Sequence, residues 1–268
     1  MTTLMPIGGN ENFKKPVVLQ EFVRRAGGEQ ADIVIFPQPS ILKNTGRDYA
    51  GLFLELGART ARSLDFRSRA ETSDESLLNA VRAASGIFIS GGTQMRLSVL
   101  IGGTPMESAI LEAYRRGVIV SGTSAGAAVM PKVMIAYGKG GPTPREGMAQ
   151  FAPGLGLTDR IVYDQHFRQR DRLGRLLYLI AAHPGLLGVG IDENTAAIVE
   201  NESVITVAGS GAVTIVDGSE IESSNVAEIE NGGAVAVSGV RIHVLTSGCT
   251  FDVSERKAGI PELHLLSK

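Results

Sequence analysis

The fold of this 268-residue chain is decided by residues 118–130, which read VIVSGTSAGAAVM. Residues 118–121 form an apolar, β-branched run that is typical of a buried strand, and the alanine-rich end of the segment favours a helix. Between them, the glycine-flanked residues 122–126 predict a sharp turn with Ser124 at its tip. Strand–turn–helix units of this kind build α/β proteins.

The same alternation of strands and helices continues upstream. Apolar content predicts strands at 31–36 and 86–90 and helices at 49–57 and 107–116, with a further helix that begins with the N-cap sequence of residues 73–76 and ends at Ser85-Gly86. Alternating strands and helices indicate a parallel sheet with helices on both faces, and ligands bind at the carboxyl ends of such strands. We therefore expect the active site at that edge.

The last third of the chain has a different texture. From about residue 188, short strand-like segments separated by turn residues replace the helices, at 195–199, 203–207, 212–216 and 241–245. No linker or charge block divides the chain. We expect a single α/β domain over residues 1–268 with a β-rich tail, read as an antiparallel extension of the sheet.

Composition excludes several classes of partner. A net charge of −2 gives no basic surface for nucleic acid or anionic membrane. No apolar run reaches the roughly 20 residues that span a bilayer. The single cysteine, Cys249, cannot form an internal disulfide, and the first residues lack the pattern of a secretory signal. We expect a cytoplasmic enzyme.

Ser124 is the candidate nucleophile. Gly122 and Gly126 leave room for the strained bend that such a serine needs, and the amide of Ala125 is placed to stabilise an oxyanion. The pattern also occurs as a plain turn with a capping serine, but the flanking strand and helix favour the nucleophile. At Gly91-Gly92-Thr93-Gln94, either the Gly92 amide supplies a second oxyanion donor and Gln94 faces substrate, or the segment is a plain turn.

A serine nucleophile needs a base that a carboxylate holds in place. His166 ends the apolar run 161–167 among polar residues, whereas the other histidines fit a helix end, a mid-strand position and the chain end: His183, His243 and His264. Placement favours His166. Asp192 and Glu193 end another apolar strand and point to opposite faces, so only one meets the histidine. An α/β-hydrolase order, serine–acid–histidine, is the competing arrangement and would use His243.

Several segments together resemble the family of serine peptidases that comprises cyanophycinases and aspartyl dipeptidase (peptidase E). The resemblance covers nearly the whole chain and rests on residues 91–94, 122–127, 164–167, 169–170, 174–177, 190–196 and 244–252. It implies a triad of Ser124, His166 and Glu193, with no metal or organic cofactor. It also implies a flavodoxin-like α/β fold related to glutamine amidotransferases, with a mostly parallel sheet, and a homodimer.

The implied substrate is cyanophycin, a poly-aspartate backbone whose side-chain carboxyls carry arginine. Each repeat presents a free carboxylate and a guanidinium. On this resemblance Arg170 and Arg175 pair with substrate carboxylate, Asp164 accepts from the guanidinium, and Gln165 and Gln94 orient amides. Without the resemblance, the interpretation is that these arginines lie on an ordinary solvated helix face. The alternatives are an aspartyl dipeptidase acting on short Asp-X peptides and a non-catalytic binding relative.

The chain departs from the usual family sequence in loops at the same sheet edge. The departures lie at residues 7–12, at 35–40, at Thr93 and in the loop around 138–145. Substrate preference depends on these loops more than on the triad.

Overall fold

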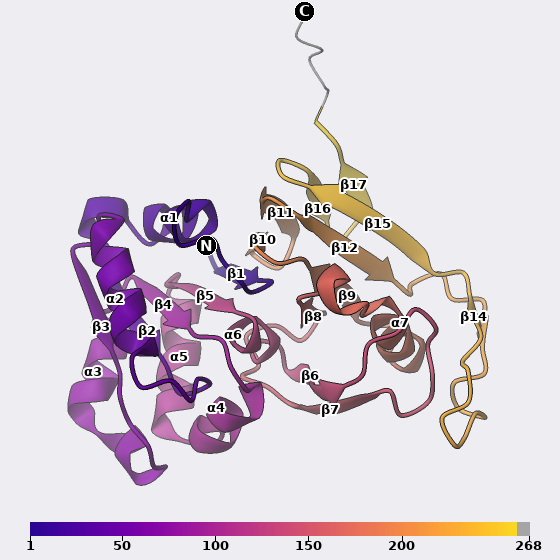
Figure 1. Ribbon diagram of the computed structural model, residues 1–268, viewed down its shortest axis with the longest axis horizontal. Coiled ribbons are helices and arrows are strands. Elements are labelled where there is room, and N and C mark those ends of the chain that lie inside the picture. The colour runs from indigo at the N-terminus through magenta and orange to yellow at the C-terminus, as the bar shows by residue number, and fades with distance from the viewer. Residues whose placement is uncertain (262–268) are drawn as a thin grey trace, which may run out of the picture.

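Two β-sheets organise the chain, for which the computed structural model describes residues 1–261 (Figure 1). The larger is a nine-stranded sheet in the order β17-β16-β11-β10-β1-β5-β4-β2-β3. Its strands are β1 (Thr3–Ile7), β2 (Asp32–Phe36), β3 (Thr60–Ser63), β4 (Gly86–Ile89), β5 (Ile119–Thr123), β10 (Thr195–Glu200), β11 (Val204–Gly209), β16 (Thr250–Asp252) and β17 (Lys257–Gly259). The half from β1 to β3 is parallel, and the half from β10 to β17 is antiparallel.

Helices cover both faces of the parallel half, as expected. Alternation along β2 explains why its sequence is apolar throughout: Ile33 and Ile35 pack with the α1–α2 side, and Val34 and Phe36 pack with the α3–α5 side. The helices are α1 (Val17–Arg25), α2 (Thr45–Glu55), α3 (Glu75–Ala83), α4 (Gln94–Ile101), α5 (Pro105–Arg115), α6 (Ala125–Ala128) and α7 (Leu173–Ala182), with 3-10 turns η1 (Gly28–Gln30), η2 (Ala70–Ser73) and η3 (Arg168–Arg170).

The predicted N-cap of α3 is confirmed, since the side chain of Asp74 accepts from the amides of Ser76 and Leu77. The prediction for α2 began too late. This helix begins at Thr45, and its first turn contains Gly46, where a Cβ atom would lie 2.0 Å from the hydroxyl of Ser63. Within residues 1–261, no helix combines the length and apolar character needed to cross a bilayer.

The tail is rich in strands, as predicted, but it does not simply extend the sheet. β10 and β11 join the larger sheet, whereas others form a second, four-stranded sheet in the order β15-β12-β9-β8. Its strands are β8 (Ile161–Gln165), β9 (Leu187–Ile191), β12 (Ala212–Asp217) and β15 (Arg241–Thr246). Two small ribbons complete the structure: β6 (Val133–Gly138) with β7 (Ala149–Pro153), and β13 (Ser223–Ser224) with β14 (Val237–Ser238). Apolar side chains of both larger sheets share one core cluster, in which Val120 and Val189 are fully buried.

Candidate active site

The turn after β5 holds Ser124 in an unusual backbone conformation. Its φ of 50° and ψ of −108° are rarely adopted by residues with a side chain. Gly122 and Gly126 make the bend possible, because a Cβ on Gly122 would lie 2.6 Å from the carbonyl of Gly126. The amide of Ser124 donates to the carbonyl of Ile7 at 2.9 Å, which ties the turn to β1. The helix that follows is only four residues long, so it contributes a single turn of free amides and not a long helix dipole.

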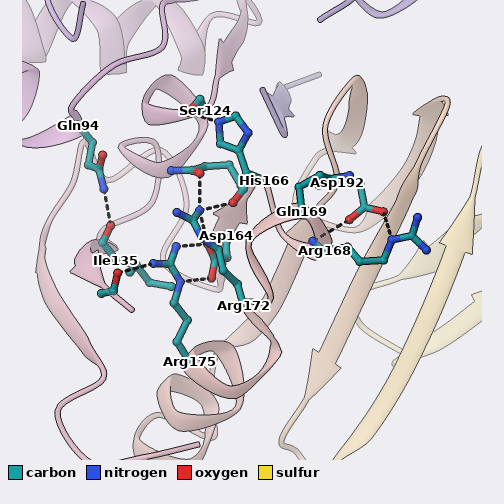
Figure 2. Close-up of polar contacts among 12 residues, drawn as sticks. Gln94, Ser124, Ile135, Asp164, His166, Arg168, Gln169, Arg172, Arg175 and Asp192 are labelled. Carbon is teal, nitrogen blue, oxygen red and sulfur yellow. Dashed lines mark hydrogen bonds and ion pairs between the residues drawn. The ribbon is translucent and has the colours of Figure 1, made fainter. Parts of the chain in front are cut away.

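His166 reaches the serine from the second sheet. It follows β8 with a φ of 48°, and its Nε2 lies 2.9 Å from Oγ of Ser124. Figure 2 shows the imidazole turned toward the serine. Gly9 lies directly against the ring, since a Cβ there would be 2.4 Å from Cε1 of His166. The amide of His166 also donates to the carbonyl of Gly8 at 2.8 Å, so the loop after β1 fixes this residue.

Glu193, just after β9, completes a hydrogen-bonded line. Its Oε1 lies 2.7 Å from Nδ1 of His166, and its Oε2 accepts from Nδ2 of Asn10 at 2.8 Å. Burial lowers the pKa of His166, against the opposing effect of its bond to Glu193. Burial alone would raise the pKa of Glu193, but the bonds from Asn10 and His166 bring it below its usual value. The pair is therefore a neutral imidazole beside an ionised carboxylate, which leaves Nε2 free to accept the serine proton.

Asp192, the other candidate acid, faces away from the histidine (Figure 2). It is 3% exposed and accepts from the amides of Arg168 and Ala212, each at 3.1 Å. Its carboxylate therefore ties η3 to β12. Of the other histidines, His183 caps α7 as expected and His243 lies within β15, while His264 lies outside the described residues.

Asp164 and Arg175, for which substrate contacts were expected, are buried and bind each other in the structure. Asp164 is 1% exposed and Arg175 4% exposed, and Nε of Arg175 donates to Oδ2 of Asp164 at 2.6 Å. Arg172, buried beside them, donates to Asp164 at 3.2 Å (Figure 2). It also donates to the backbone and side chain of Gln165. Burial lowers the pKa of Arg172 to about 10. These residues form a buried network beneath the end of β8.

The side chain of Gln94 also binds other parts of the protein, whereas that of Arg170 is exposed to solvent. The side-chain amide of Gln94 donates to the carbonyls of Ile135 and Ala136, both at 2.8 Å, and so holds β6 against the start of α4. Arg170 is exposed, and its amide donates to the carbonyl of His166 at 3.1 Å, which places it beside the histidine. Its charge lowers the pKa of both His166 and Glu193.

Two backbone amides near the serine have no protein acceptor within residues 1–261: that of Ala125, the next residue in the chain, and that of Gly92, which follows Gly91. Gly91 is close enough to the nucleophile that a Cβ on it would lie 3.5 Å from Cβ of Ser124. In the same part of the chain, no three histidine, cysteine, aspartate or glutamate side chains are grouped so that they would hold a metal ion.

A model of peptidase family S51 matches residues 4–207. The chain belongs to this family. Among S51 relatives with curated names, the cyanophycinase of Trichormus variabilis is 38% identical over 272 residues, covering 99% of this chain and 90% of the relative. The cyanophycinase of Geminocystis herdmanii is 37% identical over 269 residues, covering 97% and 98%. Family membership makes the chain a serine-type peptidase.

A similar fold is found among solved structures. The crystal structure of a peptidase from an acI-B1 Actinobacterium superimposes with a TM-score of 0.69 and 19% sequence identity, covering 94% of this chain and 97% of that one. At this identity the likeness speaks for the α/β fold alone.

The sequence patterns of this S51 peptidase did not indicate the side chains that support the histidine and the acid. Asn10 binds Glu193, Gln169 accepts from the Glu193 amide at 3.1 Å, and Arg172 shares the buried carboxylate. The loop 8–12 follows a strand of the parallel sheet, and that position was the available signal for Asn10. Arg172 lies three positions before Arg175, on the same side of the helix start, which was the signal for a shared partner.

Proposed function

We propose that this S51 peptidase hydrolyses the poly-aspartate backbone of cyanophycin and releases β-Asp-Arg dipeptides. The observation that carries the proposal is the line from Ser124 through His166 to Glu193, with contacts of 2.9 and 2.7 Å, in a chain that shares 38% identity with a curated cyanophycinase over nearly its whole length. The triad geometry alone, or the sequence identity alone, would support only a broader function.

In the proposed reaction, His166 accepts the proton of Ser124 as Oγ attacks the aspartyl carbonyl. The amides of Gly92 and Ala125 are available to bind the oxyanion, since no protein atom among residues 1–261 accepts from them. His166 then gives the proton to the leaving amine, and water hydrolyses the ester with the same histidine as base. Glu193 keeps the imidazole in the tautomer that carries its proton on Nδ1.

Of the residues predicted to contact substrate, some are proposed to bind it directly and others to act indirectly. Arg170 is the exposed cation beside the triad and is proposed to bind a substrate carboxylate. The buried Asp164 and Arg175 act indirectly, since they support the β8 end from which His166 projects. The homodimer and the cytoplasmic location remain part of the proposal, and light scattering and cell fractionation would test them.

The direct test is incubation of the purified protein with cyanophycin, with products identified by mass. Release of β-Asp-Arg is expected from the unsubstituted protein and from Ser108→Ala, which changes an exposed serine on α5, but not from Ser124→Ala. A fluorophosphonate should label the first two proteins alone. Activity on Asp-X dipeptides without polymer cleavage would support the dipeptidase instead, and absence of both activities and of labelling would support a binding protein.

A further inference from the structure

A cleft of about 700 Å³ opens beside the candidate nucleophile. Its walls are the loop 37–43 after β2, residues 65–67 after β3 and the first turns of α4. Clefts of roughly 300–1,000 Å³ accommodate ligands of drug-like size, and a β-Asp-Arg unit is of that size. Neither the triad nor the buried arginine network lines this cleft.

The cleft begins close to Ser124. Thr93 lines it and lies two residues after Gly91, the residue whose Cβ position is 3.5 Å from Cβ of Ser124. Two residues span at most about 7 Å, so the near wall lies within about 10 Å of the nucleophile. That distance corresponds to about three residues of an extended backbone. A polymer of several repeats bound at Ser124 can therefore extend into the cleft, whereas a two-repeat oligomer has no repeat beyond the two that flank the scissile bond.

The cleft carries charges of both signs. Lys43, Arg67 and Arg96 line it together with Asp65, and all four are exposed. Within residues 1–261 none of these cations lies within ion-pairing distance of a carboxylate. Nε of Arg96 donates to the carbonyl of Gln38 at 3.3 Å, which holds this side chain against the loop 37–43. The cationic groups are thus available to a ligand.

Apolar side chains lie between these charges. Ile41, Leu42 and Val99 are 77%, 71% and 63% exposed, which is high for residues of this size. Such a surface suits the aliphatic stems of long charged side chains, whose head groups then meet the charged residues around it. The mixture of isolated cations, one carboxylate and apolar surface matches a zwitterionic ligand with aliphatic segments.

We propose that this cleft is a subsite for a repeat of the polymer that lies beyond the scissile bond. Lys43, Arg67 and Arg96 bind the free carboxylate of an arginine branch, and Asp65 binds its guanidinium. The inference rests on the proposed function and adds to it a preference for long chains. Thr93 and the loop 35–40, where this sequence departs from the usual family pattern, both contribute to the cleft, so the preference is a property of this chain.

The test compares long soluble cyanophycin with a two-repeat oligomer, which has one scissile bond and no repeat beyond the two that flank it. For Lys43→Glu/Arg67→Glu, KM for the long substrate should rise about tenfold with kcat unchanged, because binding away from the reacting bond is lost equally from ground and transition states. The kcat/KM for the two-repeat oligomer should stay within about twofold. The matched control is Arg115→Glu/Arg116→Glu, which makes the same charge change at the end of α5, just before the amino end of β5 and so at the opposite edge of the sheet.

Salt provides a second measurement. KM of the unsubstituted protein for the long substrate should rise with ionic strength, and this dependence should weaken in Lys43→Glu/Arg67→Glu but not in the control. An unchanged KM for the long substrate, or an equal loss on both substrates, would overturn the subsite. Failure of the proposed function has a different signature, because the unsubstituted protein would then release no dipeptide from either substrate.

Discussion

Replacing Glu193 by glutamine should trap the histidine in an inactive tautomer, and Asn10 determines which way the new amide points. Asn10 donates at 2.8 Å to the position of Oε2, so the glutamine oxygen is favoured there and its NH₂ group faces Nδ1 of His166. Nδ1 must then accept a hydrogen bond, and the ring proton moves to Nε2. That nitrogen, 2.9 Å from Oγ of Ser124, can no longer take the serine proton.

The size of the effect follows from this geometry. An inactive tautomer in a serine triad lowers kcat by about 10⁴. For Glu193→Gln we expect a loss of about 10³–10⁴, equivalent to roughly 4–5.5 kcal/mol of transition-state stabilisation. Adding Asn10→Ala removes one ordinary hydrogen bond of about 1 kcal/mol and lets the amide rotate. The double variant should therefore be about fivefold faster than Glu193→Gln alone, although Asn10→Ala in the unsubstituted protein slows the reaction.

The assay is kcat on a soluble cyanophycin oligomer, with thermal unfolding measured in parallel. Asp192→Asn serves as the control, because that carboxylate accepts from two backbone amides and not from the histidine. Its loss should lower the melting temperature but leave kcat nearly unchanged. A Glu193→Gln variant within tenfold of the unsubstituted rate would refute the role of Glu193. A double variant no faster than the single one would refute the role of Asn10.

Three further outcomes are expected. Because burial lowers the pKa of His166 and a protonated ring cannot accept the serine proton, kcat/KM should rise with pH in a limb centred below 6.5, and a limb above that value would contradict the neutral imidazole. Gly9→Ala places a methyl 2.4 Å from Cε1 of His166 and should lower kcat by about 10², which steady-state kinetics on a protein of unchanged circular dichroism would show. Asp164→Asn leaves Arg175 buried without a carboxylate and should lower the free energy of unfolding by about 3–5 kcal/mol in urea titrations, whereas Arg168→Met, at a side chain 85% exposed, should change it by less than about 0.5 kcal/mol.

The sequence predicts the α/β half of the fold well because its signals are local. The apolar runs before Gly91 and Gly122 are strands, and each ends in the turn that the glycines indicate. Pairing between strands is not local. The runs that precede His166 and Glu193 look like further members of one sheet, yet β8 pairs with β9, and β9 pairs with β12, in a separate sheet. An apolar strand has the same pattern in either sheet.

In the candidate site, too, local sequence patterns indicate some residues, whereas the role of others depends on packing. Strand ends indicate Ser124, His166 and Glu193 because each stands where an apolar run becomes polar. Asp164 also stands at the end of such a run, and Arg175 lies on α7, the helix that follows. A sequence does not show whether two opposite charges meet a ligand or each other. Burial decides between these outcomes, and burial depends on how α7 packs over the end of β8.

The serine follows a strand of one sheet, and the histidine and glutamate follow strands of the other. The rate of catalysis therefore depends on how the two sheets are positioned relative to each other. If the two sheets moved apart by a few ångströms, the 2.9 Å contact between Ser124 and His166 would break, while the hydrogen bonds between strands within each sheet stayed intact. On heating, peptide release should therefore fade before the far-ultraviolet signal of the strands does. The short span 8–12, which touches the histidine on one side and the glutamate on the other, is where a cross-link would delay that loss.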